Sequence, residues 1–193
     1  MSLGYNVLIP YLRGHGLSEG KYLSFGALDV SDIKKWVDKI NEINPKGKII
    51  IHGLSMGGGI VLNLSNSDME NVRCLISDAP SVSIRSFFEN VSKEVFKSNS
   101  NKIASFAIKR FKKEFNLDVD EFESINIVSK SKYPILLSAG SNEHLFDLFE
   151  TIKNVNKFDT DIIILPGCNH GNGMYKQTEL YQNKIKEFIN KYI

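Results

Sequence analysis

The chain has 193 residues, of which 42% are hydrophobic and 24% charged, and its 24 basic and 22 acidic residues leave a net charge of +2. This length predicts one domain with ample apolar side chain for a core, which excludes an intrinsically disordered chain. The small charge excess gives no reason to expect a nucleic-acid partner, and the longest apolar runs, residues 49–51 and 162–165, are far too short to span a membrane.

Short apolar runs alternate along the chain with longer amphipathic stretches, a pattern typical of βαβ units and a mainly parallel sheet. Runs rich in Ile, Val and Leu are predicted as strands over residues 5–10, 48–52, 72–77, 134–139 and 161–165. Apolar residues at three- and four-residue spacing predict helices over residues 31–43, 55–65, 145–155 and 178–192. The predicted fold class is therefore α/β, with helices flanking the sheet.

The segment after the first predicted strand, residues 12–20, reads Leu-Arg-Gly-His-Gly-Leu-Ser-Glu-Gly. Because glycine tolerates backbone conformations that other residues avoid, its three glycines predict a tight loop at the carboxyl edge of the sheet. Within this loop we interpret Arg13 and His15 as structural anchors in preference to catalytic groups.

The sharpest motif is Gly53-Leu54-Ser55-Met56-Gly57, a G-x-S-x-G sequence between an apolar run and a helix-compatible one. This context predicts a nucleophile elbow, a strained strand-to-helix turn that exposes the serine at the helix N-terminus. We expect the two outer glycines to be required because side chains there would collide with the neighbouring strand and helix. The N–H that follows the serine, on Met56, is the natural oxyanion donor. The alternative is a glycine-rich turn with an incidental serine.

Residues 80–132 break the alternation, since no convincing strand is found there. Phenylalanines at positions 87, 88, 106 and 111 belong to amphipathic helical patterns, so we interpret this stretch as a helical insertion over one end of the sheet. Its basic run, residues 109–113, is expected to be a solvated helix face because Glu114 lies beside it and the whole chain is nearly neutral.

A serine nucleophile needs a base and an orienting carboxylate, which follow this elbow in the order serine, acid, histidine. His170 comes directly after the last predicted strand, where this order places the base. The acid should follow the strand at residues 134–139, which makes Glu143 the first candidate and Asp147 the second. Asp78, at the end of another strand, is a further alternative.

The two cysteines, Cys74 and Cys168, are too few for a disulfide scaffold. Cys74 lies in an apolar run and is expected to be buried. A nucleophile pair of Cys168 with His170 is disfavoured because neighbouring side chains on a loop rarely face each other. The first residues have neither the charged nor the apolar region of a secretory signal, so we expect a cytoplasmic location.

Four motifs in order carry a resemblance: R-G-H-G-x-S-x-G, H-G-x-S-M-G-G, G-x-x-acid after a strand, and N-H-G before the last helix. Over nearly the whole chain this is similar to the α/β-hydrolase superfamily, above all its bacterial serine esterase-like and acylaminoacyl-peptidase-like members with a helical cap. The resemblance implies Ser55 as nucleophile, Glu143 as acid, His170 as base and the Met56 N–H as oxyanion donor. It implies an acyl-enzyme without metal or cofactor, and a single domain over residues 1–193 whose cap is residues 80–132.

The chain departs from the family pattern chiefly at its N-terminus. In the family the R-G-H-G loop follows the fourth strand, so the first three strands, and the loop that gives a second oxyanion donor, have no counterpart here. The family's third strand lies between the fourth and fifth, which implies a gap beside residues 48–52. Either the flanking strands pair directly, a partner chain supplies the edge, or the chain is a piece of a longer product. The usual aspartate before R-G-x-G is also missing, and Glu143 stands where Asp is commoner.

The predicted function is therefore that of a serine hydrolase acting on small carboxylic esters, amides or thioesters, with an apolar group beside the aromatic insertion. A weakly active or inactive hydrolase-fold protein that binds a ligand or partner is one alternative, because a lost oxyanion donor costs on the order of 10²–10³ in rate. An acyltransferase with the same three residues is another. No metal, cofactor, nucleic acid or membrane is expected as a partner, and a homo-oligomer would complete the sheet edge.

Overall fold

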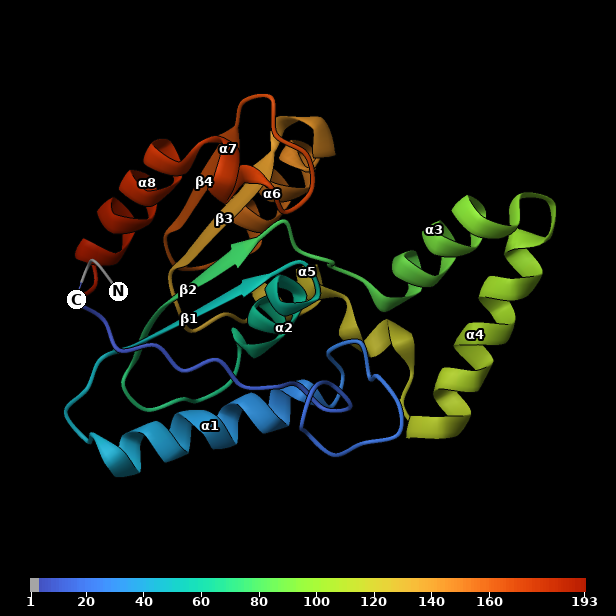
Figure 1. The fold of residues 1–193 in the computed structure, drawn as a ribbon, viewed down its shortest axis with the longest axis horizontal. Coiled ribbons are helices and arrows are strands. Elements are labelled where there is room, and N and C mark those ends of the chain that lie inside the picture. Colours follow the sequence, from blue (N-terminus) through green and yellow to red (C-terminus); the bar gives the residue numbers. More distant parts are fainter. Residues whose placement is uncertain (1–3) are drawn as a thin grey trace.

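The computed structural model describes residues 4–193, which contain a four-stranded parallel sheet with the strand order β1-β2-β3-β4 (Figure 1). The strands are β1 (Ile49–Leu54), β2 (Val72–Asp78), β3 (Ile135–Gly140) and β4 (Thr160–Leu165). All three pairings are parallel, and the two central strands are almost completely buried. The α/β fold with a mainly parallel sheet is confirmed, and the ends of these four strands lie within two residues of the sequence prediction.

Helices cover both faces of the sheet. They are α1 (Asp29–Ile43), α2 (Met56–Leu64), α3 (Ile84–Phe96), α4 (Ser100–Phe115), α5 (Ser124–Val128), α6 (Phe146–Val155), α7 (Gly173–Lys176) and α8 (Thr178–Asn190). One core lies between the sheet and α1, α2, α5 and α6, and it includes Leu62 and Phe149. A second core lies on the other face, where Tyr181 and Phe188 of α8 pack on the strands. Among the described residues, no helix has the length and apolar character that crossing a bilayer demands.

The strand predicted over residues 5–10 is wrong. This segment runs as an exposed coil that does not join the sheet (Figure 1), and Ile9 is 86% exposed. Apolar, β-branched residues favour a strand only where a neighbouring strand can take up their backbone hydrogen bonds. In the described part of the chain no strand pairs with the outer edge of β1, so the direct pairing of the two flanking strands is also excluded.

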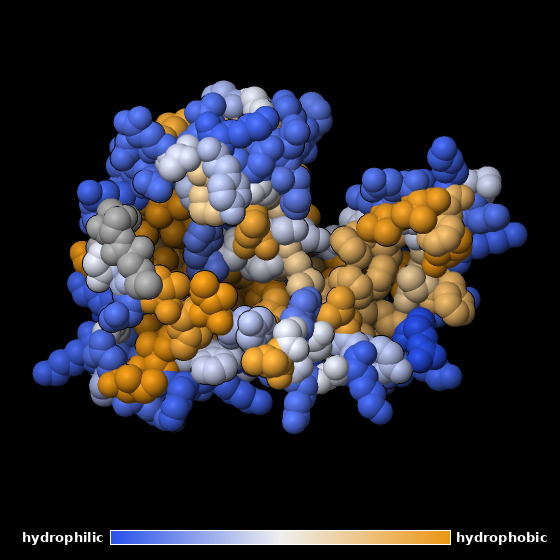
Figure 2. All heavy atoms as spheres, viewed as in Figure 1, coloured by the Kyte–Doolittle hydropathy of each residue, from blue (hydrophilic) through white to orange (hydrophobic). Residues whose placement is uncertain are grey.

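The chain between β2 and β3 is helical, and α3 and α4 form a hairpin that projects from the body of the molecule (Figure 1). Its base is an aromatic cluster in which Phe88 and Phe111 pack with Phe25, from the segment before α1. Further along the hairpin, apolar side chains lie on the surface (Figure 2), and Phe106 is 72% exposed. The hairpin therefore has a packed base and an open, partly apolar distal half.

Candidate active site

Ser55 forms the turn between β1 and α2. Its φ of 57° and ψ of −114° lie in a region that residues other than glycine rarely occupy. Its N–H donates to the carbonyl oxygen of Asp78 at 2.8 Å, and its own carbonyl oxygen accepts from Gly59 at 3.0 Å and Ser81 at 3.1 Å. These three hydrogen bonds hold the strained turn in place at the N-terminus of α2.

The glycines of this turn do not all have the role predicted from the motif. A Cβ at Gly53 would lie 2.1 Å from the carbonyl oxygen of Gly57, so glycine is required there. At Gly57 itself a Cβ would meet nothing within 4 Å, and the expectation of a clash is wrong. The crowded positions are Gly58 and Gly59, where a Cβ would come within 2.9 Å and 2.1 Å of backbone oxygens of the chain that leaves β2. Helix α2 therefore packs against the chain that leaves β2 at Gly58 and Gly59, and not at Gly57 as the motif suggests.

His170 lies between Ser55 and Glu143. Its Nε2 is 2.9 Å from the Ser55 Oγ, and its Nδ1 is 2.6 Å from Oε2 of Glu143. With the ring neutral, the Nδ1–H donates to the carboxylate and the Nε2 lone pair can accept the serine proton. The Glu143 side chain is only 9% exposed, whereas that of His170 is 59% exposed. The structure thus brings together the three residues that the sequence singled out, at a site open to solvent.

Glu143 is held by the end of its own strand. It closes a short 3-10 turn, Ser141–Glu143, and its Oε1 accepts the Gly140 N–H at 2.8 Å. A Cβ at Gly140 would lie 2.3 Å from the Cys168 carbonyl oxygen, which also accepts the Asn142 N–H at 3.1 Å. Glycine at position 140 therefore lets the loop of Glu143 approach the loop of His170.

The loop of His170 is fixed by asparagines that the sequence reading did not identify. The amide of Asn142 donates to the Asn169 side chain at 2.8 Å, and the Asn169 N–H donates to the Asn172 side chain at 2.9 Å. Such side-chain bonds to loop backbone are typical of asparagine in turns. The only sequence signal for them is the cluster of small and amide residues around each loop.

The alternative site residues lie elsewhere. Asp147 is in the first turn of α6, and the Nδ1 of His170 is bound to Glu143 instead. The carboxylate of Asp78 lies in the core beneath α8, hydrogen-bonded to Tyr181. Cys168 is fully buried and its Sγ donates to a carbonyl oxygen of its own loop at 3.6 Å, so it makes no pair with His170.

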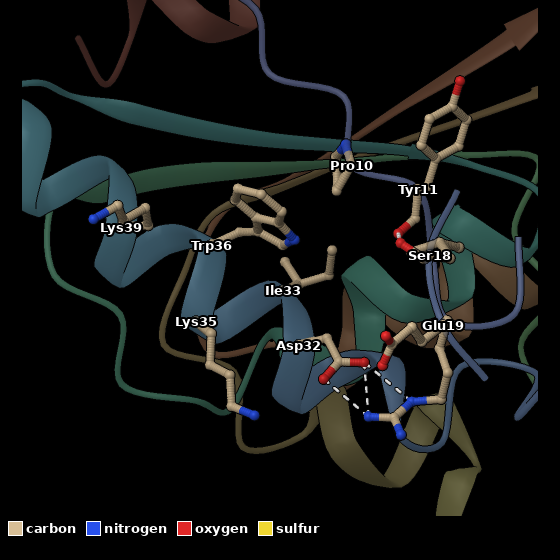
Figure 3. A pocket seen from close by; sticks show the side chains of 11 residues that line it. Pro10, Tyr11, Ser18, Glu19, Asp32, Ile33, Lys35, Trp36 and Lys39 are labelled. Carbon is tan, nitrogen blue, oxygen red and sulfur yellow. Dashed lines mark hydrogen bonds and ion pairs between the residues drawn. The ribbon is translucent and has the colours of Figure 1, made fainter. Parts of the chain in front are cut away.

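Arg13 anchors the glycine-rich loop, in agreement with its interpretation. Its guanidinium binds both carboxylate oxygens of Asp32 on α1, at distances from 2.8 to 3.1 Å (Figure 3). The Nδ1 of His15 is hydrogen-bonded to the Arg13 carbonyl oxygen at 3.0 Å. Beside this ion pair lies a cavity of about 470 Å³ between residues 10–12 and the Trp36 face of α1. None of the Ser55, Glu143 and His170 side chains lines this cavity, so it is separate from the candidate site.

The backbone at the start of α2 offers a donor beside the Ser55 hydroxyl. Met56 is the first residue of α2, and the first N–H groups of a helix have no acceptor within the helix. The positive end of the helix dipole favours negative charge at the same place. Within residues 4–193, no group of three or more His, Cys, Asp or Glu side chains is arranged to hold a metal ion.

Comparison with known proteins identifies related sequences and folds. A family model described as serine aminopeptidase, S33, matches residues 1–125, which include Ser55 but not Glu143 or His170. The uncharacterized protein YqkD of Bacillus subtilis is 24% identical over 194 residues, which cover 98% of this chain and 64% of YqkD. The chain therefore spans a little under two thirds of the length of this curated relative.

Several solved structures have a similar fold, and they include both esterases and peptidases. The Pyrococcus furiosus esterase PF2001 is 21% identical with a TM-score of 0.66, over 94% of this chain and 68% of the esterase. Est1E of Butyrivibrio proteoclasticus, determined with ferulic acid bound, is 17% identical with a TM-score of 0.65, over 94% of this chain and 74% of Est1E. At these identities the similarity establishes the fold, that of an α/β hydrolase.

Proposed function

The chain belongs to the serine aminopeptidase S33 family of α/β hydrolases. We propose that it is a serine hydrolase that cleaves carboxylic esters through an acyl-enzyme on Ser55. One observation carries the proposal. The Ser55 hydroxyl, the His170 imidazole and the Glu143 carboxylate form a hydrogen-bonded row with spacings of 2.9 and 2.6 Å. This is the order and geometry that a nucleophile, a general base and an orienting acid require.

In the proposed reaction, His170 Nε2 takes the proton of Ser55 as its Oγ attacks the ester carbonyl carbon. Glu143 holds the imidazole in the required tautomer and stabilises the imidazolium that forms. The Met56 N–H donates to the oxyanion, and the imidazolium then gives its proton to the departing alkoxide. A water molecule, deprotonated by the same histidine, releases the acid and restores the serine.

Two features favour ester substrates with an apolar acyl group. Of the two similar structures named above, one is an esterase and the other was determined with ferulic acid bound. In addition, the hairpin of α3 and α4, the proposed cap, has exposed aromatic side chains at Phe87 and Phe106. Phe88 and Phe111, which the sequence also assigned to the substrate side, pack together in the base of the hairpin and are less available.

The test combines a covalent probe with turnover. Wild-type protein is treated with a fluorophosphonate probe and assayed with p-nitrophenyl esters of increasing acyl length. We expect labelling at Ser55, turnover of the esters, and loss of both in Ser55→Ala. Asp147→Asn is the matched control, because its carboxylate makes no bond to His170. Well-folded wild-type protein that neither labels nor turns over an ester would contradict the proposal.

A further inference from the structure

A buried carboxylate lies directly behind the serine turn. Asp78, at the end of β2, is 8% exposed, and in the described part of the chain no lysine or arginine forms a salt bridge with it. Its Oδ1 accepts the Ser138 hydroxyl at 2.6 Å, and its Oδ2 accepts the Tyr181 hydroxyl at 2.9 Å. Burying a carboxylate without hydrogen-bond partners costs free energy, so these two hydroxyl groups fix the position of the Asp78 side chain.

The main chain of the same residue holds the nucleophile. The Asp78 carbonyl oxygen accepts the Ser55 N–H at 2.8 Å, and Asp78 is paired with Leu54 on one side and Ser138 on the other. A displacement of Asp78 would therefore shift the acceptor that fixes the strained backbone of Ser55. Its side chain and its carbonyl group link α8 and β3 to the turn of β1.

The residues that follow Asp78 strengthen this link. Ala79 has a φ of 44°, unusual for a residue with a side chain, and its N–H donates to the Ser138 carbonyl oxygen. Two residues later, the Ser81 N–H donates to the carbonyl oxygen of Ser55 at 3.1 Å. Both backbone groups of the serine are thus bound by residues 78–81, and this segment is in turn bound to β3.

Tyr181 supplies the hydrogen bond that closes the network. Its side chain is 3% exposed, and its single hydroxyl proton goes to Asp78, so the hydroxyl oxygen accepts from the Nε2 of His52 at 3.1 Å. Burial and the nearby Asp78 raise the pKa of Tyr181 above its ordinary value, which keeps this donor protonated at any working pH.

We propose that Tyr181 and Ser138 are positioning residues for the hydrolase reaction, because by binding the Asp78 carboxylate they fix the carbonyl group that holds Ser55 ready for attack. The inference rests on the proposed function only for its kinetic consequence. Its structural consequence, a change in the hydrogen bond of the Ser55 N–H, can be measured without any substrate.

The first test compares two tyrosine variants of the full chain. Tyr181→Phe removes the donor to Asp78, while Tyr192→Phe is the matched control, since the Tyr192 hydroxyl donates to Asp159 at 3.0 Å in a more exposed place. Active serine is titrated with the fluorophosphonate probe, and rates are expressed per titrated site. We expect Tyr181→Phe to lower kcat about tenfold or more with KM nearly unchanged, and Tyr192→Phe to change neither. Ser138→Ala should act as Tyr181→Phe does.

The second test is amide hydrogen exchange, which needs no activity. In Tyr181→Phe the Ser55 amide should exchange about tenfold faster, while the Leu75 amide, which donates to Pro134 in the core, should keep its wild-type rate. A uniform increase at both amides, or a lower melting temperature with unchanged kcat per site, would show a merely structural role and overturn the inference. If wild-type protein has no esterase activity, the proposed function fails, but the exchange experiment still decides the positioning role.

Discussion

Glu143 divides its carboxylate between two partners, with Oε2 2.6 Å from Nδ1 of His170 and Oε1 2.8 Å from the Gly140 N–H. The backbone bond orients the acid before it meets the imidazole. The position of the Glu143 carboxylate thus depends on the backbone as well as on the imidazole ring that it orients.

Replacement of this acid is the sharpest test of its role. In Glu143→Gln the amide cannot accept from both partners through two oxygens, and it favours the wrong imidazole tautomer. We expect kcat to fall by a factor on the order of 10³–10⁴. Asp147→Asn, four residues further on, should stay close to wild type. Equal losses in the two variants, measured by steady-state ester hydrolysis, would reopen the choice of acid.

The pH dependence follows from the direction of proton transfer. The His170 ring must be neutral to accept the Ser55 proton, so kcat/KM should increase with pH until the base is fully available. The measurement is a rate profile with an ester whose hydrolysis is monitored at constant ionic strength. A profile that stays flat at every pH at which the protein is folded would argue against histidine as the base.

The glycines of the elbow give a paired stability prediction. Gly53→Ala places a methyl group 2.1 Å from the Gly57 carbonyl oxygen, and we expect a large loss of stability together with loss of activity. Gly57→Ala places a methyl group in open space within α2, where alanine is a better helix former by up to about 1 kcal/mol. Thermal unfolding should therefore separate the two variants in opposite directions, and a destabilised Gly57→Ala would contradict the open space seen there.

The cysteines should be inert in the folded protein. Burial raises the pKa of the Cys74 thiol to about 12, so it remains a thiol at neutral and mildly alkaline pH, and Cys168 is fully buried. Iodoacetamide at pH 8 should leave both unmodified and leave activity intact, while urea-unfolded protein should take up two labels. Inactivation of the folded protein by the reagent would instead point to a thiol in the mechanism.

What the sequence could predict was local. A few consecutive residues are enough to predict the apolar runs of β1 to β4, the turn at Ser55 and the histidine after β4. The reason is that a buried strand requires apolar residues and the serine turn requires glycines. Residues 5–10 have the composition of a strand but no adjacent strand to pair with. Whether a strand has a pairing partner depends on residues far away in the sequence, so it cannot be predicted from local composition. The contact of Gly140 with Cys168 is missed for the same reason, since it joins loops that follow different strands.

The free edge of β1 has a consequence for how this protein behaves in solution. Ile49 and Ser55 both donate toward β2, so by strand alternation the N–H groups of Ile50, His52 and Leu54 point outward, where the described residues place no strand. Those amides should exchange with solvent quickly, and they form a template for an incoming extended chain. Because Leu54 precedes Ser55, such a chain would add to the strand on which the nucleophile stands, and specific activity would then depend on protein concentration.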